Sequence, residues 1–135
     1  MANLYDLFYA DESLKNNGRW IDYEKWGVSF KIASLDSKEY KKALKDLLRS
    51  LSVGSGSLLK YRSDEQNERM LLDLFSKHIV KDWRGVTDEN GEELPYSSES
   101  VKKIMTDLPE LYKELYSIAS DVSTFVLGKQ KAAQE

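Results

Sequence analysis

The stretch Arg19-Trp20-Ile21-Asp22-Tyr23-Glu24-Lys25-Trp26-Gly27-Val28-Ser29-Phe30-Lys31-Ile32-Ala33 carries the β-strand signal of this chain. Val28, Phe30 and Ile32 alternate with Ser29 and Lys31, which is the two-residue period of a half-buried strand. An aromatic and β-branched run precedes the turn that contains Gly27, and it reads as the partner strand. The stretch therefore predicts a β-hairpin over residues 19–33.

The sequence before the hairpin is ambiguous. Leu4, Leu7 and Phe8 fit one helical face, but Asn16-Asn17-Gly18 ends anything that begins there. No element is assigned to residues 3–17.

After the hairpin the hydrophobic period becomes helical. Asp36 and Glu39 are placed as a helix N-cap and its reciprocal partner, and Ser63 with Gln66 predicts a second capping box. Between them, residues 54–57 (Gly-Ser-Gly-Ser) predict a flexible connector. The two helices on either side of this connector have apolar faces formed by Tyr40, Ala43, Leu44, Leu47, Leu48 and Leu51, and by Leu71, Leu74, Phe75, His78 and Ile79.

Residues 83–97 lack helical periodicity and predict a long loop, with two of the seven glycines and one of the two prolines. Ser97 then caps a short helix that carries Val101, Ile104 and Met105. Residues 107–110 (Asp-Leu-Pro-Glu) predict a new helix start, with Asp107 as the cap and the proline in the first turn. The last helix has its apolar face formed by Leu111, Leu115, Ile118, Ala119, Val122 and Phe125, with Gly128 as its C-cap residue.

These segments predict a mainly α (α+β) fold, a helical domain of about four helices with a small N-terminal β-hairpin. The length suits one domain, assigned to residues 1–128. Residues 129–135 have little to bury and are expected to form a disordered tail.

Composition excludes several classes of protein. The 20 basic and 23 acidic residues give a net charge of −3, which argues against nucleic acid as the main partner. There are no cysteines, so disulfides and thiolate metal sites are excluded. No apolar run approaches the roughly 18 residues that span a bilayer, and the N-terminus lacks the pattern of a secretion signal.

No residue pattern assembles catalytic chemistry. His78 is the only histidine, and a zinc site around it would need further ligands from Asp and Glu alone. An acidic cluster surrounds Asn90-Gly91, but its spacing fits a calcium loop poorly and favours a solvated turn, in which Asn90-Gly91 supplies positive φ angles. The cluster consists of Asp88, Glu89, Glu92 and Glu93. We expect a non-enzymatic protein with no catalytic residue, metal or cofactor.

Two groups of residues are candidates for partner binding. The hairpin is rich in aromatic residues, which either pack in the core or form an exposed edge for a partner. The helix after the hairpin has a basic face, which is either solvated or a partner site. The candidates are Trp20, Tyr23, Trp26 and Phe30 in the hairpin, and Lys41, Lys42 and Lys45 in the helix.

The order of these parts resembles the tail assembly chaperones of long-tailed, siphovirus-type bacteriophages. The similarity lies in three blocks: residues 18–33 followed by a helix with Tyr40, residues 80–99 with the run Leu94-Pro95-Tyr96-Ser97, and residues 111–125. Residues 52–62 depart from the pattern. In the second block, the resemblance implies structural roles for Trp83, Gly85, Gly91, Pro95 and Ser97.

The resemblance implies a self-associating chaperone that binds the tape measure protein, keeps it soluble and helps to recruit tail tube subunits. Such proteins act in the host cytoplasm and are absent from the mature virion. For this chain, the charge balance and the lack of a membrane-spanning run predict neither nucleic acid nor membrane as a partner. Gly128-Lys129 is compatible with the programmed frameshift found in many of these phages. The alternative is another phage morphogenesis component, such as a minor tail or head–tail connection protein.

Overall fold

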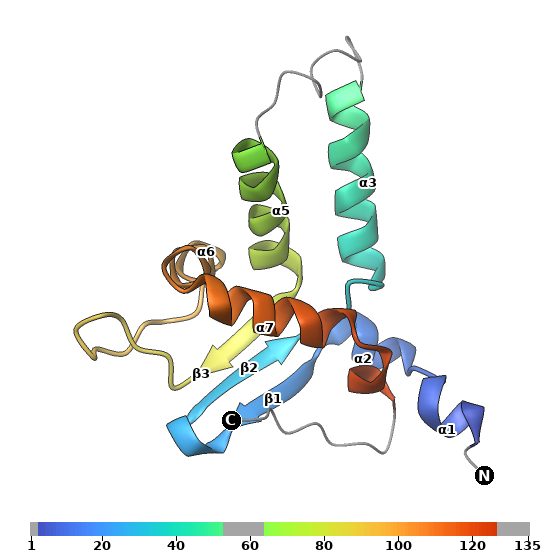
Figure 1. Ribbon diagram of the computed structural model, residues 1–135, viewed down its shortest axis with the longest axis horizontal. Coiled ribbons are helices and arrows are strands. Elements are labelled where there is room, and N and C mark those ends of the chain that lie inside the picture. Colours follow the sequence, from blue (N-terminus) through green and yellow to red (C-terminus); the bar gives the residue numbers. More distant parts are fainter. Residues whose placement is uncertain (1–2, 53–63, 127–135) are drawn as a thin grey trace.

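The computed structural model describes residues 3–52 and 64–126, which form six α-helices, two short 3-10 helices and one three-stranded antiparallel sheet (Figure 1). The elements are α1 (Leu4–Phe8), α2 (Glu12–Asn17), β1 (Arg19–Tyr23), η1 (Glu24–Trp26), β2 (Val28–Ile32), α3 (Lys38–Ser52), α5 (Asp64–His78), β3 (Val80–Arg84), α6 (Ser98–Asp107), α7 (Pro109–Ser120) and η2 (Val122–Phe125). The sheet order is β1-β2-β3.

The predicted β-hairpin is confirmed. β1 pairs antiparallel with β2, and Ile21 lies opposite Phe30. The chain reverses through η1 and through Gly27, whose φ of 68° lies in the left-handed region that favours glycine. Alternation along the strands directs Ile21, Phe30 and Ile32 into the core, whereas Asp22 is exposed.

The fold-class prediction is wrong about the sheet, because the hairpin has a third strand. β3 pairs antiparallel with β2, with Phe30 opposite Trp83, so the chain at 83–84 is strand rather than loop. The register shifts between Lys31 and Ile32, because Ile32 pairs with Val80 and Lys31 with Asp82. Because of this irregularity, the buried residues of β3, Val80 and Trp83, are three positions apart instead of two. A spacing of three is typical of a helix, so the sequence does not show the alternation of a strand.

The predicted number of about four helices is also wrong, since the described residues contain six. The four predicted helices correspond to α3, α5, α6 and α7. The two others, α1 and α2, lie in the N-terminal segment, where Asn3 and Asp11 cap them by accepting bonds from Tyr5 N and Leu14 N. Helices of five and six residues are too short to display a periodic apolar face.

One face of the sheet packs against two helices, with α5 on β3 and α7 on β2, and α7 runs across the sheet (Figure 1). Helix α6 packs on α5 and α7 and adds its buried residues to the same core. The core consists of Ile21, Tyr23, Phe30, Ile32, Tyr40, Phe75, Ile79, Val80, Trp83, Val86, Val101, Ile104, Met105, Leu115, Ile118 and Ala119. The other face of the sheet carries polar residues, and there the guanidinium carbon of Arg84 lies 4.0 Å from the ring centroid of Trp20.

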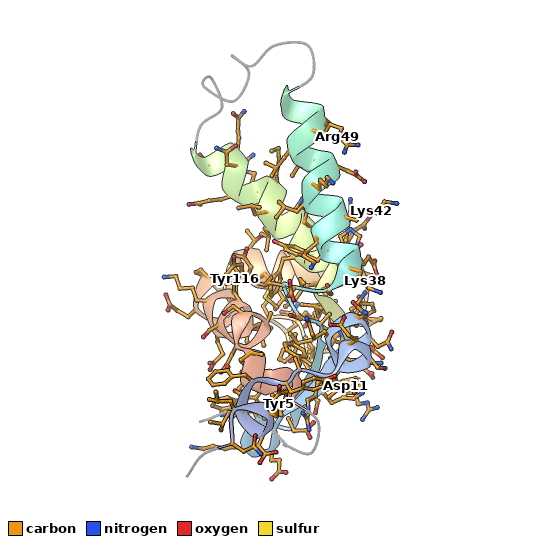
Figure 2. The ribbon with its side chains drawn as sticks, turned by 90° about the vertical axis from the view of Figure 1, so that its right-hand side faces the viewer. Tyr5, Asp11, Lys38, Lys42, Arg49 and Tyr116 are labelled. Atoms are coloured by element: carbon orange, nitrogen blue, oxygen red, sulfur yellow. The ribbon has the colours of Figure 1, made fainter. Side chains whose placement is uncertain are left out.

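Helices α3 and α5 run side by side in opposite directions and project away from the sheet (Figures 1 and 2). We call this pair the arm. Among the described side chains of α3, the predicted apolar face is fully buried only at the base of the arm. Tyr40 joins the core there, whereas Leu47 is half-buried and Leu48 is 52% exposed. The arm therefore has apolar surface that the rest of the described chain leaves uncovered.

Three predicted helix ends differ from the structure. Helix α3 begins at Lys38, with its first helical bond from Lys41 N to Ser37 O, so Asp36 is not the cap. Asp107 is the last residue of α6, and α7 follows Leu108 without a side-chain cap. The last helix ends at Ser120, where the Asp121 carboxylate begins the separate turn η2 by accepting from Ser123 N.

Some predictions lie outside the described residues. They are the connector at 54–57, the Ser63 cap, the Gly128 C-cap with the Gly128-Lys129 pair, and the tail at 129–135. Within residues 3–52 and 64–126, no helix is long and apolar enough to cross a membrane.

Candidate partner-binding surfaces

Ion pairs fix the base of the arm to the rest of the protein. Asp36 Oδ2 lies 2.6 Å from Lys15 Nζ of α2. Glu39 of α3 binds two groups, with Oε1 2.7 Å from His78 Nδ1 and Oε2 2.8 Å from Lys81 Nζ. The neighbouring ammonium groups, chiefly Lys15 for Asp36 and Lys81 for Glu39, hold the pKa of each carboxyl below its usual value. Glu39 thus connects α3 to the end of α5 and to β3.

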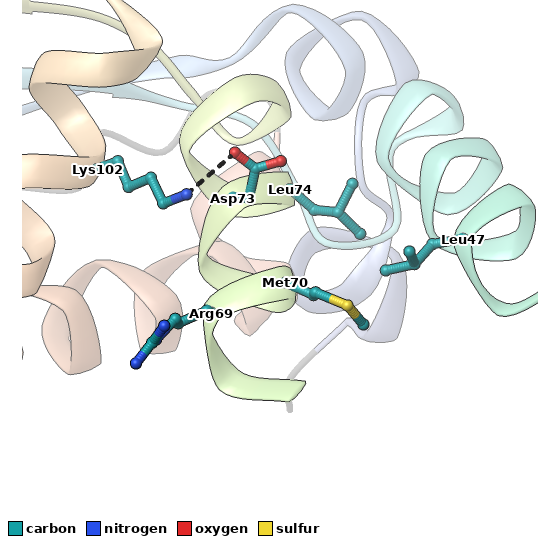
Figure 3. A pocket seen from close by; sticks show the side chains of 6 residues that line it. All are labelled: Leu47, Arg69, Met70, Asp73, Leu74 and Lys102. Atoms are coloured by element: carbon teal, nitrogen blue, oxygen red, sulfur yellow. Dashed lines mark ion pairs between the residues drawn. The ribbon is translucent and has the colours of Figure 1, made fainter. Parts of the chain in front are cut away.

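A groove lies between α3, α5 and α6, with a volume of about 300 Å³ (Figure 3). We call it the arm groove. It has an apolar floor and a charged rim, and the floor comes from both helices of the arm. Figure 3 shows Leu47, Met70 and Leu74 pointing toward one another between α3 and α5, and we call this apolar side the floor. The charged residues Arg69, Asp73 and Lys102 lie on the other side of α5, and we call this side the rim.

Asp73 organises the rim of the arm groove. Its carboxylate lies 3.0 Å from Lys77 Nζ and 3.5 Å from Lys102 Nζ of α6. Burial alone would raise the pKa of Asp73, but the two ammonium groups outweigh it and lower the pKa. The rim therefore keeps both signs of charge beside an apolar floor, which suits the apolar stripe and the mixed flanks of an amphipathic helix.

A second groove, of about 540 Å³, lies between α5 and α7. The ring of Tyr112 packs edge-on to Phe75 at 5.0 Å, and Tyr116 stacks on Phe75 at 6.0 Å. Burial raises the pKa of Tyr112 to about 12, so its hydroxyl remains a hydrogen-bond donor at neutral pH. Leu71 and Tyr116 give this groove an exposed apolar edge.

The structure separates the four aromatic residues predicted to bind a partner. Tyr23 and Phe30 are each 3% exposed and pack in the core. Trp26 is 58% exposed and stacks on Tyr23, with 5.5 Å between the ring centroids. Trp20 is half-buried under Arg84 on the opposite face of the sheet. The accessible aromatic rings, Trp20 and Trp26, therefore do not form one surface.

The predicted lysines are all exposed on α3. Lys41 Nζ lies 3.0 Å from Asp36 Oδ1, at the base of the arm. Lys38, Lys42 and Arg49 lie on the side of α3 away from α5 (Figure 2). Helical spacing places Lys45 on the same basic stripe.

The loop that follows β3 is tied to the core at both ends. Trp83 is buried, and its Nε1 donates to Leu94 O at 2.9 Å. The Tyr96 hydroxyl donates to Val80 O at 2.6 Å. Gly85 adopts a φ of 74°, which a residue with a side chain rarely takes. The rings of Trp83 and Tyr96 pack edge-on, with their centroids 5.8 Å apart, and this contact keeps the two ends of the loop together.

The acidic part of this loop is a tight turn. Asp88 Oδ1 accepts from Asn90 N at 2.8 Å and from Glu92 N at 3.0 Å, and Gly91 has a φ of 80°. Asn90 does not share the positive φ that its pairing with Gly91 predicted. Pro95 is exposed, and Ser97 Oγ caps α6 by accepting from Ser100 N at 3.0 Å. No group of three or more potential metal ligands occurs among the described residues.

Sequence reasoning missed the arm groove and an aromatic patch on α1. The groove needs α3, α5 and α6 together, so the periodic positions Leu47, Met70 and Leu74 alone do not reveal it. The patch consists of Leu4, Tyr5, Phe8 and Tyr9, all largely exposed. The sequence feature that could have indicated this patch is the run of large apolar residues within residues 3–17, to which no element was assigned.

The fold and surfaces define a small α+β protein with a two-helix arm and with apolar grooves along its helices. Residues 35–135 match the model of the YdaY prophage protein family, so the chain belongs to this family and is phage-derived. The match begins after β2, and it includes the arm, both grooves and the loop after β3. Comparisons with curated proteins and with solved structures found no match.

Proposed function

We propose that this protein is a phage tail assembly chaperone that binds the tape measure protein, keeps it soluble and helps to recruit tail tube subunits. The proposed role is non-enzymatic and belongs to the host cytoplasm during assembly, without a place in the mature virion. The observation that carries the proposal is the arm groove, an apolar floor with a charged rim inside the part of the chain that matches the prophage family. The resemblance in the order of the sequence blocks supports the same role.

The arm groove suits a helical partner for a physical reason. A long helical chain with apolar stripes aggregates unless another surface covers those stripes. Leu47, Met70 and Leu74 offer such a cover, because they are half-buried and side by side. An apolar side chain gains about 1.5–3 kcal/mol on full burial, before the cost of association. Two or three such anchors favour reversible binding, as expected of a partner that must later be released.

The test is co-expression with the tape measure protein of the same phage, measuring how much tape measure protein stays in the soluble fraction. We expect the wild-type chain to raise that fraction and to co-purify with it. Met70→Gln combined with Leu47→Gln should lower the co-purified amount about tenfold, because polar side chains weaken apolar anchoring. Circular dichroism verifies that the variant folds.

The matched control is Leu108→Gln, at a leucine that is also half-exposed but lies between α6 and α7, outside the groove. This variant should bind as the wild type does. The proposal fails if the wild-type chain leaves the solubility of the tape measure protein unchanged. Detection of the chain as a stoichiometric part of purified virions by mass spectrometry would replace it with a minor tail or head–tail connection role.

A further inference from the structure

The two helices of the arm carry opposite charge. Helix α3 has five basic and two acidic residues, whereas α5 has four acidic and two basic residues. Lys45 on α3 and Glu68 on α5 are examples of these charges. Both are exposed, and neither has an ion-pair partner among the described residues, so both charges are available to a second molecule. Such an arm is complementary to a second copy of itself when a two-fold axis runs parallel to both arms. The basic α3 of each copy then faces the acidic α5 of the other.

One side of the arm also exposes leucines from both helices. Leu47 of α3 and Met70 of α5 line the arm groove. Leu48 and Leu71 are the next residues on the two helices, so each side chain points about 100° around its helix axis from the residue before it. Because α3 and α5 are antiparallel, these two rotations turn Leu48 and Leu71 to the same side of the arm. Leu48 is 52% exposed and Leu71 is 41% exposed.

That side faces α7 rather than α6. Leu71 lines the groove between α5 and α7 together with Tyr116, which lies at the base of the arm (Figure 2). Lys45 and Glu68 each precede an exposed leucine by three residues, so they lie next to the leucines on their helices. The result is an apolar strip flanked by a cation on α3 and by an anion on α5.

We propose that this face, formed by Leu48, Leu71 and Tyr116 with Lys45 and Glu68 beside them, binds a second copy of the chain. The two arms point in the same direction and form a four-helix bundle, in which α3 of each copy packs on α5 of the other. This arrangement places basic helix on acidic helix at both contacts. Arms pointing in opposite directions would place α3 on α3 and α5 on α5, with like charges at both contacts.

The proposed dimer does not rest on the chaperone role, and it uses a different side of the arm from the groove. Asp73 on the rim of the groove and Leu71 on the dimer face are two residues apart, so they point to opposite sides of α5. A chain that dimerises without binding the tape measure protein would overturn only the proposed function. A monomer that binds it would overturn only the dimer.

The first test is sedimentation equilibrium of the full chain over a wide range of concentration. We expect a reversible dimer, and Leu48→Ala with Leu71→Ala should raise its dissociation constant at least about tenfold. Leu108→Ala is the matched control, since this leucine is 50% exposed and lies elsewhere, and its dissociation constant should equal that of the wild type. A wild-type monomer at every concentration, or an unchanged dimer in the double variant, overturns the proposal.

The second test decides the direction of the arms. Lys45→Glu and Glu68→Lys should each weaken the dimer severalfold, because each creates like charges across α3 and α5 of the two copies. Both changes in one chain should restore the wild-type affinity, since the charges are then exchanged on both helices. A combined variant that dimerises no better than the single variants overturns the arrangement with parallel arms.

Discussion

At the scale of single residues, Gly85 shows how tightly the loop after β3 meets the hairpin. Its φ of 74° is left-handed, and a Cβ at this position would overlap the carbonyl oxygen of Gly27. Gly91 has a similar φ of 80°, but a Cβ there would meet nothing within 4 Å. The two glycines therefore share the backbone requirement and differ in the space around them.

We predict that Gly85→Ala lowers the free energy of unfolding by about 3 kcal/mol or more, because backbone strain and a steric overlap add together. Gly91→Ala should cost only about 1 kcal/mol, the strain of the left-handed conformation alone. Urea unfolding measures both values. Equal losses in the two variants would show that the contact with Gly27 does not constrain the fold.

At the scale of elements, Glu39 joins the base of the arm to two other elements. Its carboxylate accepts from Lys81 of β3 and lies within hydrogen-bond distance of His78 at the end of α5. Because the carboxyl is about half-exposed, each contact is weak by itself. Their effect is orientation, since they fix the first turn of α3 against α5 and the sheet.

This contact predicts a pH dependence of stability. Lys81 and His78 lower the pKa of Glu39 below its ordinary value of 4.5, so the folded state binds this proton less readily than the unfolded state. The stabilisation is therefore present above pH 4.5 and is lost as the pH falls through the lower folded pKa. In Glu39→Gln, the free energy of unfolding should be lower near neutral pH and should approach that of the wild type in acid.

The measurement is urea unfolding at a series of pH values for the wild type and for Glu39→Gln. Glu65→Gln is the control, because Glu65 pairs with Arg69 one turn away on the same helix, at 2.6 Å, and connects no elements. Its stability should lie close to that of the wild type near neutral pH. A Glu39→Gln variant whose stability equals the wild type at every pH would contradict a stabilising role of the contact.

At the scale of the whole molecule, the core depends on a hairpin that lies outside the family match. The match begins at residue 35, yet Ile21, Phe30 and Ile32 are core residues from β1 and β2. β2 is also the central strand, so β3 has no other strand to pair with. The matched segment therefore lacks part of its own core.

We predict that a fragment of residues 35–135 does not fold into this structure, because it loses the β2–β3 pairing and exposes its half of the core. Amide chemical-shift dispersion measured by NMR and near-ultraviolet circular dichroism would detect the loss. A chain without residues 1–9 is the matched control, since α1 contains no buried residue, and it should keep the native dispersion. A well-dispersed spectrum of the 35–135 fragment would contradict this account of the core.

The sequence by itself determined the elements that depend on local patterns. The hairpin, the four longer helices and the Ser97 cap follow from periodicity and from capping chemistry, which act over a few residues. The predicted role of Asp36 and Glu39 was wrong, because a local capping box gave way to ion pairs with Lys15, His78 and Lys81 elsewhere in the fold.

Only the tertiary structure decided the third strand, the extent of burial along α3 and the grooves of the arm. β3 needs β2 as its partner, and the irregular register between them removes the alternation that would reveal a strand. Likewise, Tyr40 and Leu48 lie on the same predicted face, yet one is in the core and the other is exposed. The physical reason is that burial and pairing depend on segments distant in the chain, which periodicity within a single segment does not record.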